Sequence, residues 1–249
     1  MKILYGVQGT GNGHVSRSTH IIDALQKRGM TVNVIFSGCG ADKVYDPAII
    51  RSPRFYKGFT FCVRRGRIHP ADTVRQLSFF RFLKDVQDFE ADDYDLIITD
   101  FEPVSAWIAR KNHRPCIGIG HQYAFLHDIP MDRSNPLSKY IFQWFAPVDV
   151  AIGMHWHHFD QPILPPVIPT QVVPSDTVDP SLILVYLPFE NKDQVRDLLL
   201  AFTDFQFAVY AQHSGATPVR ENNIHWHPFS RTDFYRDLGR CAGDRKSVV

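Results

Sequence analysis

KILYGVQGTGNGHVSR, residues 2–17, is the most informative part of this sequence, because an apolar run there breaks into glycines and reopens as a helical pattern. The apolar run predicts a buried strand that ends by Gly9, and apolar residues at helical spacing predict a helix that continues to Gly29. Three glycines at alternate positions, Gly9, Gly11 and Gly13, let the backbone turn sharply and approach a ligand closely. The helix then directs its free N–H groups and positive dipole end at the loop, which favours an anionic group such as a phosphate.

The loop differs from the dinucleotide-binding fingerprint, in which glycines stand two and then three positions apart. Here Gly9 and Gly11 are followed by Gly13, and His14 stands where the third glycine belongs. No acidic residue ends the second apolar run, residues 32–36, so the side chain that usually binds the ribose is missing. A nicotinamide-dependent Rossmann oxidoreductase is therefore the weaker hypothesis, and a tight turn without a ligand is the plain structural alternative.

GTGNGH, residues 9–14, resembles the amino-terminal glycine loop of the GT-B glycosyltransferases, especially the MurG-like and UDP-glycosyltransferase groups. The resemblance implies two Rossmann-like domains that face a cleft, with the acceptor held mainly by the first and a nucleotide-sugar donor mainly by the second. It also implies no bound metal or other cofactor, since helix ends and basic side chains neutralise the leaving diphosphate.

Bulk composition narrows the class of protein. The chain has 249 residues with 27 Lys and Arg against 26 Asp and Glu, so no overall field favours nucleic acid. Its 4 cysteines are far apart, which argues against a zinc ribbon or a disulfide framework and favours a reducing compartment. The first strand begins at the amino terminus and no apolar run is long enough to span a bilayer, so we expect a cytoplasmic protein. Peripheral contact with the inner face of a membrane is left open.

Strand and helix patterns alternate along the chain, which predicts an α/β fold with parallel sheets and helices on both faces. We place a first Rossmann-like, acceptor-side domain at residues 1–159, a proline-rich linker at 160–180 and a partial, donor-side Rossmann-like domain at 181–249. The strand over residues 148–152 is expected to be the last of the first domain.

Beyond the linker, the pattern predicts strands at 182–187, 205–210 and 223–226, with helices at 192–202 and 232–238. Residues 241–249 show none of the strand and helix pattern that the resembled family carries at this point. We therefore expect an incomplete second domain, an incomplete donor site and an open sheet edge that favours self-association.

Polar residues follow the ends of the predicted strands of the first domain. Ligands of open parallel sheets bind at the carboxyl ends of the strands, so these residues are expected along one edge. They are His14, Asp100, Glu102, His121 and Gln122.

Glycosyl transfer requires that an acceptor hydroxyl lose its proton and that the departing diphosphate be stabilised. His14 is predicted as the general base, because imidazole exchanges protons near neutral pH, and Asp100 as the acid that orients it. The pair resembles the His–Asp dyad of UDP-glycosyltransferases, although a MurG-like histidine that mainly binds substrate is the alternative. Six further residues are predicted to bind substrate: Gly11, Asn12, Gly13, Glu102, His121 and Gln122. The last two resemble the His-Glu-Gln segment of MurG-like proteins without its glutamate, which leaves their role open.

Two histidine-rich segments, residues 155–158 and 225–227, invite a metal hypothesis. The first lacks the order of a metallohydrolase motif, and we expect alternating histidines on a strand to face both ways. Polar contacts at strand ends or packing between domains are therefore predicted, and no metal.

Two other segments leave alternatives open. For the basic residues between Arg51 and Arg67 there are three interpretations: they bind an anionic lipid, they bind a phosphorylated acceptor, or they face only solvent. The apolar residues 140–144 form an acceptor-domain helix or a patch that faces a membrane.

The predicted function is the transfer of a hexosyl group from a nucleotide-sugar, UDP-linked, to a cell-envelope or other hydroxyl acceptor. The alternative from another class is a non-catalytic remnant that binds such substrates without turnover.

Overall fold

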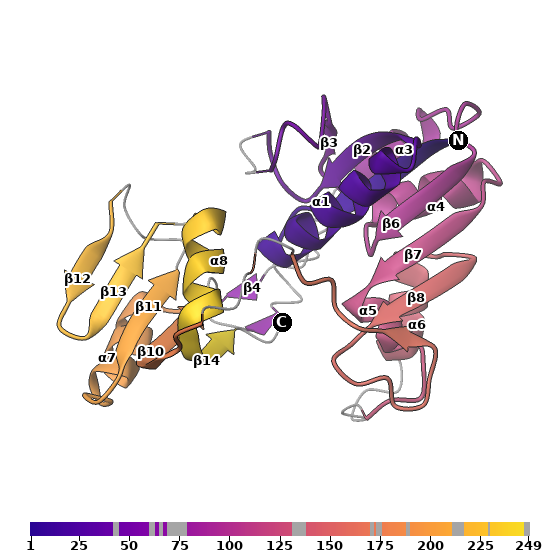
Figure 1. The fold of residues 1–249 in the computed structure, drawn as a ribbon. Helices are drawn as coiled ribbons and strands as arrows, with labels where there is room; N and C mark the ends of the chain where they lie inside the picture. Colours follow the sequence, from indigo (N-terminus) through magenta and orange to yellow (C-terminus); the bar gives the residue numbers. More distant parts are fainter. Residues whose placement is uncertain are drawn as a thin grey trace. The chain divides into compact units, whose positions relative to one another are not determined.

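The computed structural model describes residues 1–41, 45–59, 63–64, 67–68, 79–130, 138–169, 172, 176–187, 190–210, 217–228 and 230–246. The chain divides into two compact units, which are described separately (Figure 1). The first unit contains Met1–Thr60 and Arg75–Ile168, and the second contains Phe61–Val74 and Pro169–Val249.

The first unit is built on a sheet whose described strands are all parallel, in the order β3-β2-β1-β6-β7-β8-β9. The strands are β1 (Lys2–Gln8), β2 (Thr31–Ser37), β3 (Arg54–Tyr56), β6 (Leu96–Asp100), β7 (Cys116–Gly120), β8 (Val150–Met154) and β9 (Ile163–Leu164). The expectation that residues 148–152 form the last strand of this unit is wrong, because the two-residue β9 pairs with β8 from within the proline-rich stretch.

Helices cover both faces of this sheet, as predicted for a parallel α/β sheet (Figure 1). They are α1 (Asn12–Lys27), α3 (Phe79–Gln87), α4 (Pro103–Lys111), α5 (His121–Ala124) and α6 (Ser138–Phe145). Successive side chains of β1 point to opposite faces: Ile3 and Tyr5 pack in one cluster with α1, whereas Leu4 packs in another with α3 and α4. The first part of the predicted long helix, residues 71–78, lies outside the described residues.

The strand order places the topological switch point of the first unit between β1 and β6. From β1 the chain moves outward to β2 and β3, and it then returns to the other side of β1 as β6. The carboxyl ends of these two neighbours therefore lead into connections that leave in opposite directions. Open α/β sheets bind their ligands at this position.

The second unit has a sheet in the order β12-β13-β11-β10-β14, in which β12 and β13 are antiparallel and the other pairs are parallel. Its elements are β10 (Asp179–Tyr186), α7 (Lys192–Leu200), β11 (Gln206–Tyr210), β12 (Val219–Glu221), β13 (Ile224–His227), α8 (Arg231–Arg240) and β14 (Cys241–Lys246). A short antiparallel pair, β4 (Val63–Arg64) and β5 (Arg67–Ile68), belongs to the same unit.

The expectation that residues 241–249 carry no strand is wrong for β14, which pairs in parallel with β10. Its sequence, CAGDRK, has no apolar run that would predict a strand. In the described sheet β14 is an edge strand, and edge strands commonly carry charged side chains. Gly243 lies close to Ile183, where a side chain would come into ordinary contact.

Candidate functional site

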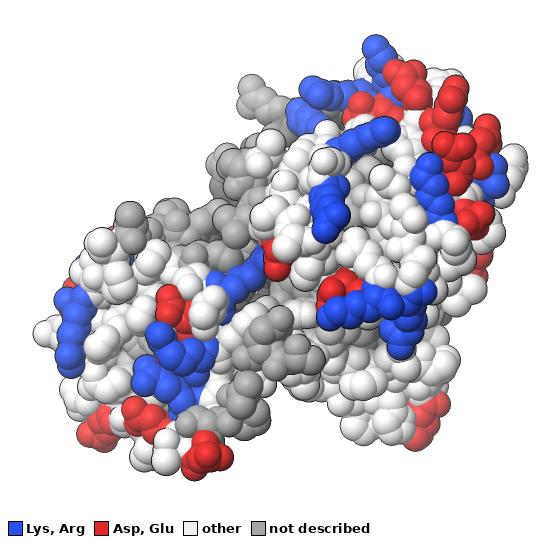
Figure 2. Space-filling model, turned by 45° about the horizontal axis from the view of Figure 1, so that its top comes forward, with Lys and Arg blue, Asp and Glu red and all other residues white. Residues whose placement is uncertain are grey.

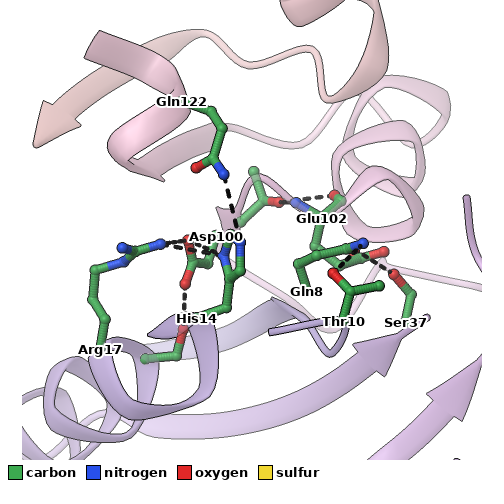
Figure 3. Close-up of polar contacts among 10 residues, drawn as sticks. Gln8, Thr10, His14, Arg17, Ser37, Asp100, Glu102 and Gln122 are labelled. Carbon is green, nitrogen blue, oxygen red and sulfur yellow. Dashed lines mark hydrogen bonds and ion pairs between the residues drawn. The ribbon is translucent and has the colours of Figure 1, made fainter. Parts of the chain in front are cut away.

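Three neighbouring strand ends of the first unit bring polar side chains together at the switch point (Figure 3). His14 lies in the first turn of α1, after β1, and Asp100 is the last residue of β6. Gln122 lies in α5, directly after β7. The predicted gathering of these three residues on one edge of the sheet is confirmed.

Asp100 is fully buried and accepts hydrogen bonds from several side chains of α1. Ser18 Oγ donates to Oδ2 at 2.8 Å, His14 Nδ1 lies 3.2 Å from Oδ1, and Arg17 forms an ion pair with Oδ1. Burial alone would raise the pKa of Asp100, but the Arg17 guanidinium and His14 outweigh it and hold that pKa below its usual value. The ionised Asp100 has no exposed surface, so a ligand at this edge of the sheet would meet His14 rather than the carboxylate itself.

The hydrogen bonds of His14 define its useful tautomer. A proton on Nδ1 donates to Asp100 Oδ1, which leaves the lone pair on Nε2. Nε2 faces Gln122, whose Nε2 lies 3.5 Å away (Figure 3). The His14 side chain as a whole is 17% exposed. The arrangement is that of an imidazole oriented by a buried carboxylate.

Arg17 belongs to the same cluster and was not predicted. Its Nη2 lies 3.2 Å from His14 Nδ1, and the same nitrogen pairs with Asp100 Oδ1. Positions three apart on a helix lie on the same face, so α1 presents His14 and Arg17 together. That spacing was a usable signal in the sequence.

Two backbone features allow Asp100 to reach α1. A Cβ at Gly120 would lie 3.0 Å from Asp100 Oδ1, so glycine at the end of β7 leaves room for the carboxylate. Phe101, the next residue after Asp100, has φ of 51°, in the left-handed region that non-glycine residues rarely adopt. Its ring is buried against Phe145 at 5.0 Å between centroids, and this packing holds the turn.

The prediction that Glu102 binds substrate from the rim does not agree with its position. Glu102 is fully buried and is the N-cap of α4: its carboxylate accepts from Val104 N at 2.6 Å and from Ser105 N at 2.7 Å. Thr99 Oγ1 donates to Glu102 O and accepts from Glu102 N, each at 2.8 Å. Burial raises the pKa of Glu102, against the lowering effect of its hydrogen bonds. Both carboxylate oxygens therefore serve the helix, and none is presented to a ligand.

The three glycines of the loop differ in their surroundings: Gly9 is required by packing, a Cβ at Gly11 would contact His14 Cδ2 at 3.7 Å, and Gly13 faces open space. A Cβ at Gly9 would lie 2.2 Å from Cys39 Sγ, so this glycine lets the loops after β1 and β2 meet. A Cβ at Gly13 would have nothing within 4 Å, and Gly11, the N-cap of α1, has no side chain to accept from the first-turn N–H groups. Asn12, half-buried, is the first residue of α1. The amino end of α1 is therefore approachable by a ligand.

His121 makes its direct contacts with β8 and with the residue that follows β8. Its Nδ1 lies 3.0 Å from Met154 O, and its ring stacks on His155 at 5.3 Å. Burial lowers its pKa, with smaller contributions that include the nearby His155. His121 thus links the ends of β7 and β8, and its predicted substrate contact remains a prediction.

The histidine-rich segments make local contacts. The Nδ1 atoms of His155, His157 and His158 each accept from a backbone N–H two residues further on, at 2.9–3.1 Å. The expectation of opposite faces is wrong for His225 and His227, which are two positions apart on β13 and lie on one face, 6.4 Å between ring centroids. Over the part of the chain that the structure describes, no three His, Cys, Asp or Glu side chains are arranged to hold a metal ion.

A second polar cluster at the ends of β1 and β2 was not predicted. Ser37 Oγ donates to Gln8 Oε1 at 3.2 Å, and Gln8 Nε2 donates to Thr10 Oγ1 at 3.4 Å (Figure 3). Gln8 is buried, so these bonds fix the start of the glycine loop. Gln8 and Ser37 are the last residues of β1 and β2, so the strand-end pattern in the sequence could have indicated both.

The surface charge is mixed, in keeping with the net charge of +1. Figure 2 shows acidic and basic side chains side by side on the visible face. None of the helices in the described ranges is long and apolar enough to cross a bilayer. Of the basic residues between Arg51 and Arg67, Arg54 lies over the Phe89 ring at 5.5 Å, and Arg65 is outside the described residues. Trp144 of α6 packs on Trp107 and is 63% exposed.

Comparison with solved structures identifies the fold. The glycosyltransferase SsfS6 from Streptomyces sp. SF2575 is similar with a TM-score of 0.54 and 14% identity, covering 94% of this chain and 73% of that one. MurG from Acinetobacter baumannii is similar with a TM-score of 0.51 and 14% identity, covering 96% of this chain and 70% of MurG. The glycosyltransferase SnogD from Streptomyces nogalater is similar with a TM-score of 0.50 and 12% identity, covering 99% of this chain and 87% of SnogD. The fold is therefore of the GT-B glycosyltransferase type, and the predicted α/β class with two Rossmann-like domains is confirmed.

A family model described as Glycosyl transferase family 1 matches residues 1–243, and the chain belongs to this family. No curated protein sequence gives a significant match. The family assignment confirms the resemblance seen in the glycine loop and removes the nicotinamide-dependent oxidoreductase from the alternatives.

Proposed function

We propose that the protein transfers a hexosyl group from a nucleoside diphosphate sugar to a hydroxyl acceptor, with His14 as the general base and Asp100 as its positioning carboxylate. One observation carries the proposal: His14 Nδ1 lies 3.2 Å from Oδ1 of the buried Asp100 carboxylate, so a proton on Nδ1 leaves the lone pair on Nε2 at the switch point of the sheet. A neutral imidazole oriented in this way is suited to accept a hydroxyl proton.

The proposed reaction is a single displacement. His14 Nε2 takes the proton of the acceptor hydroxyl while the acceptor oxygen bonds to the anomeric carbon. The bond between that carbon and the diphosphate oxygen breaks, and its electron pair leaves with the diphosphate. Asp100 stabilises the imidazolium that forms, and the configuration at the anomeric carbon inverts.

The donor is proposed to be UDP-linked and the acceptor a cell-envelope or similar hydroxyl compound. The structure of SsfS6 with thymidine diphosphate shows a pyrimidine nucleotide bound to a protein of this fold. In the first unit, Gln122 lies 3.5 Å from His14 Nε2, and Gly11, Asn12 and Gly13 lie at the amino end of α1. All four are proposed to contact substrate. The N–H groups at the start of α1 favour an anionic or hydroxyl oxygen there.

Calorimetric titration with UDP, thymidine diphosphate, ADP and UDP-hexoses tests the donor class, followed by product detection with a panel of hydroxyl acceptors. We expect a pyrimidine diphosphate to bind and its sugar to be transferred. Binding without turnover at any pH would support the non-catalytic alternative. Absence of binding by every nucleotide would overturn the donor assignment.

Two variants of α1 then test the base. His14→Ala should lose turnover by at least ~100-fold while nucleotide affinity is kept, because general base catalysis contributes ~10²–10⁴-fold. His20→Ala, on the same helix, is the matched control and should keep the activity.

A further inference from the structure

The buried carboxylate of Asp100 is shared between two cations, one permanent and one conditional. Arg17 and His14 Nδ1 both approach the same oxygen, Oδ1, while Ser18 occupies Oδ2. We infer that Arg17 is a positioning residue that neutralises Asp100, so that His14 stays uncharged and retains the Nε2 lone pair that a general base requires. This inference rests on the proposed role of His14.

The physical reason is charge balance in a site with little water. A buried carboxylate with no permanent cation would draw a second proton onto the nearest base, here His14. The Arg17 Nη2 lies 3.2 Å from His14 Nδ1, so its positive charge opposes that second proton directly as well as through Asp100. Arg17 holds its own charge: burial disfavours it, but Asp100 overcomes this effect and the pKa of Arg17 is raised.

Among the described residues, the other groups near this cluster are neutral or weakly placed to replace Arg17. From β1, Tyr5 is fully buried, and burial raises its pKa. From α5, Gln122 carries no charge, and burial lowers the pKa of His121. Arg17 is therefore the one permanent cation among the described groups that face His14.

Geometry adds a second effect of Arg17. The side chains of Arg17 and His14 lie on one face of α1, and each is 17% exposed. Through its ion pair with Oδ1, Arg17 also holds the carboxylate in place. A carboxylate oxygen only accepts hydrogen bonds, so the Nδ1–H tautomer of His14 is the one that can donate to Asp100.

The test is an NMR titration of the His14 ring nitrogens, which needs no substrate and does not depend on turnover. Arg17→Gln should move the titration midpoint of His14 upward by ~1 pH unit or more. Arg17→Lys keeps the charge and should restore most of the native midpoint. Arg28→Gln, at the C-cap of the same helix, removes an equal charge far from the site and should leave the midpoint unchanged.

A folded Arg17→Gln variant with an unchanged or lowered midpoint would overturn the inference. Asp100→Asn tests the same charge balance by removing the negative charge instead of the positive one. This variant also provides the test if Arg17→Gln does not fold. Without the carboxylate, Arg17 should push the His14 midpoint down by ~1 unit or more. An unchanged or raised midpoint in that variant would contradict the inference equally.

Turnover supplies a separate readout. In Arg17→Gln the acidic limb of the pH–rate profile should move upward by the same amount as the NMR midpoint, with the plateau at high pH retained. If the native protein proves to have no glycosyl transfer, the proposed function fails, whereas the titration of His14 still decides the role of Arg17.

Discussion

Replacement of Glu102 by alanine should destabilise the first unit without removing the proposed chemistry. The change deletes both acceptors at the N-cap of α4 and leaves the N–H groups of Val104 and Ser105, both fully buried, without partners. Each such orphaned group costs ~1–3 kcal/mol. The variant no longer buries a carboxylate, and burial of that carboxylate is unfavourable, as the raised pKa of Glu102 indicates. This gain offsets part of the loss. The expected net loss is about 2–3 kcal/mol of unfolding free energy.

Urea unfolding followed by tryptophan fluorescence measures this loss. At ~2–4 °C per kcal/mol, Tm should fall by about 5–10 °C. Glu102→Gln keeps one acceptor oxygen and should lie between native and alanine variants. Glu90→Ala, exposed, serves as the matched control and should change stability by less than ~0.5 kcal/mol. A stable Glu102→Ala protein with a strongly raised KM would refute the capping role and restore the substrate contact.

Two further predictions concern the charge and the loop. The pKa of Asp100 is lowered in the folded state, so its contribution to stability is present above the unfolded pKa of ~3.9 and is lost as pH falls through the folded value. Asp100→Asn should flatten acid unfolding curves in this range, and identical curves would contradict the prediction. Gly9→Ala should cost ~1–3 kcal/mol, because its Cβ meets Cys39, whereas Gly13→Ala should leave stability within ~1 kcal/mol. If Gly13 faces substrate, that variant should instead weaken substrate binding by ~10-fold; native affinity would remove Gly13 from the site.

The sequence was sufficient for the switch-point residues and insufficient for their partners. His14 and Asp100 were found because each follows a buried apolar run, and the parallel sheet brings such ends to one edge. Arg17 was missed because it lies inside a helix, where only its spacing of three from His14 links it to the site. Glu102 also follows a strand end, but it sits at the start of α4. Glutamate is not a preferred N-cap residue, so the only local sign of that role was Pro103 at the first position of the helix.

Errors in the second unit have similarly specific causes. The polar sequence of β14 does not show strand periodicity, since its place is set by pairing with β10. His225 and His227 share a face because side chains on a strand repeat every second position.

The most direct test of the central claim is the rate of glycosyl transfer by native protein and His14→Ala at equal nucleotide occupancy. Calorimetry fixes the occupancy, and NMR of the product gives the configuration at the anomeric carbon. The account predicts an inverted product, nucleotide affinity within a few-fold of native and a rate lower by at least ~100-fold in the variant. A His14→Ala protein that transfers sugar at the native rate, or a native product with retained configuration, would contradict it.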